Sequence, residues 1–134
     1  MLSLRIAQVA IALFALGHGV GMLQGRFRDD AEKAAIEGLR AYRFDIMGVR
    51  RSHHDFYLGM GHSLTLFLVF AAALIQWLIP LGASDPQGLQ PILAALCIVF
   101  AVMTAFCIRW FFPAPLVLSA VASVALGWAA WGVV

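Results

Sequence analysis

The stretch FYLGMGHSLTLFLVFAAALIQWLIPL, residues 56–81, decides the fold of this chain. It contains no Asp, Glu, Lys or Arg. At about 1.5 Å per residue, a helix of this length crosses the ~30 Å hydrocarbon core of a bilayer. A helix is required in lipid because each backbone amide without a hydrogen bond costs several kcal/mol. The stretch therefore predicts a transmembrane helix.

Three further apolar stretches, residues 6–25, 92–112 and 115–134, predict three more spans. Of the 134 residues, 63% are hydrophobic and 12% charged, whereas soluble domains are near half apolar and a quarter charged. This balance excludes a soluble globular domain, a disordered tail, a fibrous repeat and a nucleic-acid-binding module. We predict one integral membrane domain over residues 1–134, with an all-α, four-helix transmembrane bundle. Because Arg5 precedes an apolar run, a signal peptide is the alternative for the first stretch.

The basic residues predict the orientation of the spans. The connection between the first two spans holds Arg26, Arg28, Lys33, Arg40, Arg43, Arg50 and Arg51, and residues 82–91 hold neither Lys nor Arg. By the positive-inside rule the first connection is cytoplasmic, so both termini are periplasmic. The tryptophans at the predicted outer ends agree with this orientation, because tryptophan is enriched at membrane interfaces: Trp77, Trp128 and Trp131.

The first connection is expected to contain an amphipathic helix over residues 30–46. Asp29 or Asp30 can cap its start, and Glu32 is placed for a capping box with Asp29. Apolar residues recur at steps of four, three and four along one face, at Ala35, Leu39, Tyr42 and Ile46. Such a helix suits the membrane interface, where it would contact lipid. A solvated helix packed on the end of the bundle is the alternative.

Small residues recur every four positions on two spans and predict close helix packing. These residues are Gly17, Gly21 and Gly25 on the first span, and Ser119, Ser123 and Gly127 on the fourth. The pattern leaves open whether the partner helix belongs to the same chain, to a second copy or to a larger membrane complex. Cys97 and Cys107 lie too far apart along one helix to form a disulfide, so we interpret them as packing residues.

Ionisable residues inside spans are costly, which makes each a candidate for function. His18 and His62 fall at nearly one depth because the first two spans are antiparallel. Asp55 shares a helix face with His62, and Arg109 ends the third span on the same predicted side. We predict a cytoplasm-facing polar pocket. In it, acid/base chemistry would use Asp55, His62 and Arg109, and ligand binding would use His18, Ser63 and Thr104.

Two other interpretations of these residues stay open. Asp55 and Arg109 could form a structural ion pair, with the histidines donating to backbone carbonyls. Haem or copper could instead bind His18 and His62. His53 and His54 are adjacent, so they lack the i, i+4 spacing with which two histidines on one helix bind a metal ion. We predict no metal and no cofactor.

The segment FDIMGVRRSHHDFYLGMG, residues 44–61, resembles the signature of a family of small, uncharacterised bacterial four-span membrane proteins. In that family FD-x-M-G is followed by R-S-x-x-D-F-Y-x-G. The R-W-F-F-P-x-P run at residues 109–115 and the Gly17–His18 pair are also similar. The resemblance implies a bacterial inner-membrane location and a shared site at Asp55, Tyr57 and Arg109, with Tyr57 contacting ligand. The family often has Trp where this chain has His54.

A weaker likeness to DoxX-type proteins rests on the Leu-Arg-Ile start and the His18–Gly19 pair, and would imply a redox-associated membrane subunit. The Lys expected after that pair is absent. We expect a membrane protein whose polar pocket holds a lipophilic small molecule, with isomerase-like proton transfer as its chemistry if it is an enzyme. The alternative is a non-catalytic accessory subunit that docks on a larger complex through its Gly and Ser ridges. A transporter is less favoured, because no ionisable residue lies at the predicted bilayer centre.

Overall fold

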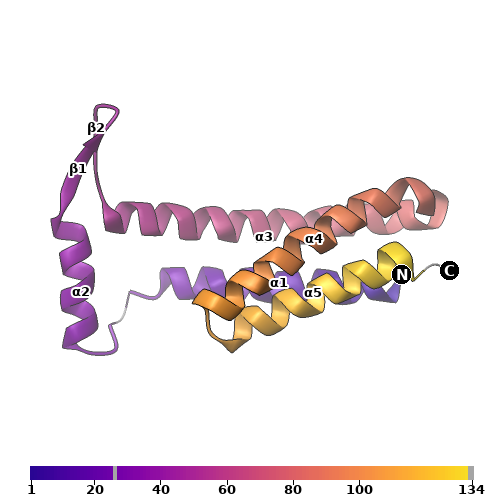
Figure 1. Cartoon of the computed structure of the whole chain (residues 1–134), viewed down its shortest axis with the longest axis horizontal. Helices are drawn as coiled ribbons and strands as arrows, with labels where there is room; N and C mark the ends of the chain where they lie inside the picture. The colour runs from indigo at the N-terminus through magenta and orange to yellow at the C-terminus, as the bar shows by residue number, and fades with distance from the viewer. Residues whose placement is uncertain (26, 133–134) are drawn as a thin grey trace. The chain divides into compact units, whose positions relative to one another are not determined.

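The computed structural model describes residues 1–25 and 27–132, which contain four long helices. These are α1 (Leu2–Leu23), α3 (His53–Ser84), α4 (Pro86–Trp110) and α5 (Pro113–Trp131) (Figure 1). Each is long and apolar enough to cross a membrane, so four helical segments of transmembrane length are confirmed. Arg26 and the last two residues of the fourth predicted span lie outside the described residues.

The helices around the second connection extend further than predicted. The predicted second span ends at residue 81, whereas α3 continues to Ser84 with Pro80 inside it, and α4 begins at Pro86 rather than at residue 92. Proline removes one hydrogen bond inside a helix but none at its first turn, where the N–H has no helical partner. Asp85 caps α4, because its carboxylate accepts from the Gly88 N–H at 2.9 Å.

A short turn connects α4 to α5. α4 ends at Trp110 and α5 begins at Pro113. The Ser123 hydroxyl donates to the Cys97 carbonyl at 3.1 Å, and the hydroxyl oxygens of Thr104 and Ser119 lie 3.0 Å apart. Because the partner number falls on α5 as the number rises on α4, the two helices are antiparallel.

The chain divides into two compact units, each of which takes part of α1 and part of α3. The terminal unit contains Met1–Leu16 and residues 67–132, and the hairpin unit contains Gly17–Leu66. The largest fully buried apolar side chains all belong to the terminal unit: Phe100, Ile11, Leu68, Ile75 and Leu126. This unit therefore holds the densest part of the apolar core.

The helix expected over residues 30–46 is wrong beyond residue 41. Helix α2 covers Asp30–Ala41, after which β1 (Arg43–Ile46) pairs antiparallel with β2 (Val49–Ser52). Met47 and Gly48 connect the strands with φ angles of +50° and +80°. Positive φ at both central residues is the type I′ arrangement, whose twist matches that of the flanking strands. The turn therefore favours a hairpin over continuation of the helix.

At the start of α2 one bond of the predicted capping box forms, while the return bond comes from Arg28 rather than from Asp29. The Glu32 N–H donates to Asp29 Oδ1 at 2.7 Å, and the Glu32 carboxylate accepts from the Arg28 N–H. That backbone hydrogen bond is the main reason why the pKa of Glu32 is lowered below its ordinary value. None of the residues in α2 is buried. Its apolar face is therefore exposed within the hairpin unit, and the location of this helix at a membrane interface stays a prediction.

Candidate functional site

The hairpin unit brings His18 of α1 against the first half of α3. His18 Nδ1 lies 2.9 Å from the Thr65 hydroxyl oxygen, and that hydroxyl donates to the Gly61 carbonyl at 3.2 Å. The proton of this hydrogen bond lies on Nδ1 or on the hydroxyl according to the tautomer of His18, and in either case the bond leaves Nε2 as the other ring nitrogen.

Small residues permit this close approach of α1 and α3. A Cβ added at Gly61 would lie 2.2 Å from Met22 Cε, and one added at Gly19 would lie 3.2 Å from Thr65 Cγ2. His62 follows Gly61 on α3. The two histidines that the depth argument placed together belong to the same unit, and their pairing stays a prediction.

Asp55, expected to be catalytic, takes part in the cap at the start of α3. Its carboxylate accepts from the Ser52 N–H at 2.8 Å, and its own N–H donates to the Ser52 hydroxyl at 3.2 Å. This reciprocal pair is a capping box, which satisfies two backbone donors that the helix cannot. Ser52 is buried, at 1% exposure. The spacing Ser-x-x-Asp could have identified this structural role from the sequence.

Arg109 belongs to the terminal unit, near the end of α4, where its guanidinium lies 5.9 Å from the centre of the Trp110 ring. Asp55 belongs to the hairpin unit, and its charge interacts there with Arg43 and Arg51. The pairing of Asp55 with Arg109 stays a prediction.

The other expected ligand residues have local partners. The Ser63 hydroxyl donates to the Gly59 carbonyl at 2.8 Å, and the ring of Tyr57 lies 6.4 Å from that of His54. Thr104 lies in the terminal unit, where it donates to the Phe100 carbonyl at 2.7 Å besides its contact with Ser119. The Ser63 bond stays within α3, whereas Thr104 also links α4 to α5, and ligand binding by either residue stays a prediction.

His53 and His54, which are adjacent in sequence, have separate partners. His53 stacks on Tyr42 with ring centres 5.7 Å apart and lies 4.9 Å from the ring of Phe44. His54 Nε2 lies 3.4 Å from the guanidinium of Arg40. Because guanidinium can only donate, His54 Nε2 must accept. Sequence reasoning missed this cluster because it expected a helix where Phe44 lies in a strand.

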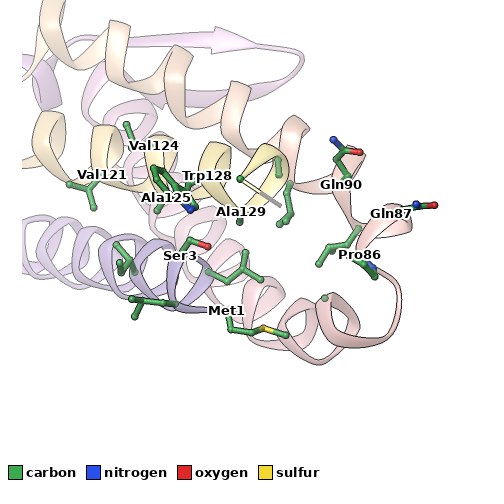
Figure 2. A pocket seen from close by; sticks show the side chains of 18 of the residues that line it. Met1, Ser3, Pro86, Gln87, Gln90, Val121, Val124, Ala125, Trp128 and Ala129 are labelled. Atoms are coloured by element: carbon green, nitrogen blue, oxygen red, sulfur yellow. The ribbon is translucent and has the colours of Figure 1, made fainter. Parts of the chain in front are cut away.

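A cavity of about 1160 Å³ lies at one end of the terminal unit. Its walls come from the start of α1, the α3–α4 connection and the last turns of α5 (Figure 2). Gln87 and Gln90 lie at one end of it, and Val121 and Val124 at the other (Figure 2). A largely apolar lining with a few polar groups is typical of sites for lipophilic molecules. None of the predicted site residues lines this cavity.

A polar network in the terminal unit was also missed. Gln76 of α3 accepts at Oε1 from the Arg5 guanidinium at 2.7 Å and from the Gln8 amide at 3.0 Å. Gln8 also donates to the Ala72 carbonyl at 3.4 Å. The i, i+3 spacing of Arg5 and Gln8 could have suggested that they share a face. Hydrogen bonds of this kind link transmembrane helices.

The two small-residue ridges differ in their surroundings. On α5, Ser119 and Ser123 bond to α4, and a Cβ added at Gly127 would lie 3.3 Å from the Cys97 sulfur. On α1, a Cβ added at Gly17, Gly21 or Gly25 would meet no described atom of its own unit within 4 Å. The ridge on α5 thus packs within the chain, and the ridge on α1 is open in the hairpin unit.

Comparison of the chain with protein-family models, curated proteins and solved structures finds no match. The family signature at residues 44–61 therefore stays a resemblance. Proposals about function have to rest on the chemistry of the sites described above.

Proposed function

We propose that the protein is a multi-span membrane protein that binds a lipophilic small molecule in the cavity of the terminal unit. The cavity itself carries this proposal. It measures about 1160 Å³, which is ample for a drug-sized ligand. Aliphatic side chains and Trp128 form most of the lining, while Ser3, Gln87 and Gln90 supply a few hydrogen-bonding groups. Such groups orient a ligand whose affinity comes mainly from apolar contact.

Proton-transfer chemistry remains a separate proposal, and the histidine pair of the hairpin unit supports it best. His18 Nδ1 is hydrogen-bonded to the Thr65 hydroxyl, so Nε2 is the ring nitrogen that we assign to proton transfer. His62 is exposed and belongs to the same unit. One oxygen of Asp55 is used in the cap of α3, so we assign the acid/base role to the histidines ahead of Asp55. An isomerase-like reaction needs such a donor and acceptor pair.

We further propose that both termini lie on the periplasmic side of a bacterial inner membrane. The lining of the cavity brings Met1, the α3–α4 connection and the end of α5 to the same end of the terminal unit. An even number of spans puts both termini on the same side of the membrane. The basic residues of the first connection favour the cytoplasm for the opposite side.

In a background in which Cys97 and Cys107 are replaced by alanine, Gln87→Cys should react with an impermeant thiol reagent added outside, and Lys33→Cys should not. Gln87 precedes Gly88 in the first turn of α4 and is exposed, so this substitution spares the Asp85 cap. Lys33 is exposed on α2. Protection of Gln87→Cys together with labelling of Lys33→Cys would invert the proposed orientation.

Native mass spectrometry of protein purified in mild detergent tests the binding function. We expect a bound apolar molecule, present in a fixed ratio to the chain and smaller than a phospholipid. An empty chain, or one that carries only the bulk phospholipids of the membrane, would contradict the proposal.

The second candidate function is an accessory subunit that docks on a larger membrane complex. The observation that favours it is the open ridge of Gly17, Gly21 and Gly25 on α1. In lipid, such ridges drive association because backbones can approach closely along them. An empty cavity in the mass spectra would favour this function over ligand binding.

A further inference from the structure

A second hollow, separate from the cavity, lies at the start of α3 in the hairpin unit. It measures about 540 Å³ and is lined by Arg51, Asp55, Phe56, Gly59, Met60 and Ser63. The four lining positions from 56 onward are spaced by three, one and three residues, which places them along one face of the helix. We call this hollow the Arg51 groove.

Gly59 provides the floor of the Arg51 groove. A Cβ added there would meet no described atom within 4 Å. The neighbouring walls are apolar and open, since Phe56 is 43% exposed and Met60 is 71% exposed. A groove of this kind along an apolar helix has the shape and chemistry of a site for an acyl chain.

The register of the hairpin explains why Arg51, and not Arg50, lines the groove. Phe44 pairs with Arg51 and Ile46 pairs with Val49. Residues opposite each other share a face of the sheet, so Arg51 lies on the same face as the three apolar residues. Phe44 in turn stacks on Phe56 of α3, with ring centres 5.9 Å apart. The apolar face of the hairpin is thereby joined to the wall of the groove.

The hairpin beside the groove carries more positive than negative charge, whereas the groove itself is lined by one arginine, Arg51, and one aspartate, Asp55. Between residues 43 and 52 there are three arginines and one aspartate. Within the described chain, the Arg51 guanidinium donates only to the Arg50 carbonyl, at 3.1 Å. Asp55 adds one negative charge, and its carboxylate already accepts from the Ser52 N–H. Arg51 therefore keeps N–H donors for an anion, and guanidinium binds phosphate through paired hydrogen bonds.

We propose that the Arg51 groove binds an anionic phospholipid, with the phosphate on Arg51 and an acyl chain along Phe56, Gly59 and Met60. This rests on the proposed membrane location, and it is independent of the ligand in the terminal unit. A phospholipid matches both halves of the groove, because it joins an anion to an apolar chain. A free anion would use only Arg51, and an uncharged lipid only the apolar walls.

Two pairs of matched variants test the proposal in protein purified in detergent and titrated with phosphatidylglycerol or phosphatidylcholine. Arg51→Gln should weaken binding of phosphatidylglycerol about tenfold and abolish its advantage over phosphatidylcholine. Arg50→Gln removes the same charge from the opposite face of the hairpin and should change the affinity less than about twofold. Native mass spectra give the bound fraction of each lipid.

The second pair of variants adds a large side chain at a glycine instead of removing a charge. Gly59→Leu should block the groove and weaken binding of both lipids about tenfold, whereas Gly17→Leu, at an equally open glycine of α1, should leave binding unchanged. Circular dichroism should show that all four variants keep their helices. Equal effects within either pair, or equal affinity of the unchanged chain for both lipids, would overturn the proposal.

The same native mass spectra distinguish lipid binding in the Arg51 groove from ligand binding in the cavity of the terminal unit. Phosphatidylglycerol binding that follows Arg51 and Gly59 while the cavity is empty would support the groove and refute the cavity ligand. A retained cavity ligand with no response to either substitution would do the reverse.

Discussion

Replacing Ala129 by phenylalanine is expected to lower the affinity for the cavity ligand by at least about tenfold, because the phenyl ring would occupy space that the ligand needs. Ala129 lies on α5 in the wall of the cavity (Figure 2). The fraction of protein that retains the co-purified molecule in native mass spectra measures the effect.

Ala101→Phe is the matched control for this substitution. Ala101 is exposed on α4 and does not line the cavity. The same change in side chain is made in another apolar helix, so its effect on helix formation should be similar. If both variants retain the molecule equally, the ligand does not occupy the cavity.

Phe100→Ala should lower the free energy of unfolding by about 3 kcal/mol. Phe100 is fully buried in the terminal unit, at 0% exposure. Its removal would leave a void whose lining atoms lose their dispersion contacts, a loss that remains even where the surroundings are lipid rather than water. Unfolding in mixed micelles with increasing denaturing detergent, followed by circular dichroism, measures the change.

Phe70→Ala serves as the control for Phe100→Ala. Phe70 lies on α3 in the same unit but is 54% exposed, so its removal leaves no enclosed void. We expect a change of less than about 1 kcal/mol. A loss as large as that of Phe100→Ala would mean that the core is not centred where the structure places it.

The sequence was sufficient for the four long helices because length and apolarity leave few other structures in lipid. It was less informative at the ends of the helices. Pro80 and Pro91 lie inside helices, each removing one hydrogen bond without ending its helix.

The hairpin was missed because the same residues fit two structures. Tyr42 and Ile46 continue the helical spacing of Leu39, yet Phe44 and Ile46 also alternate with charged residues as in a strand. The turn favours the strands, because Met47 and Gly48 both adopt the positive φ of a hairpin turn. A glycine after Met47, between two alternating segments, was the available signal.

The candidate sites differ in how far they could be predicted. The placement of His18 and His62 in one unit followed from depth, because antiparallel helices bring residues at equal depth together. The cavity could not be foreseen in the same way, because its walls come from three segments far apart in the chain. Asp55 forms a helix cap that its Ser-x-x-Asp spacing could have shown, while its expected chemistry stays a prediction.

The division of the chain also bears on the order in which the protein is made and assembled. The first half of α1 belongs to the same unit as residues 67–132, and Arg5 bonds Gln76 across 71 positions. By contrast, the hydrogen bonds between α4 and α5 join residues 15 to 26 positions apart. Contacts of long sequence separation form late, because the intervening chain must first be closed into a loop. Helix α1 therefore reaches its final packing only after α3 has been synthesised, and Arg5 and Gln8 lack their α3 partners until then.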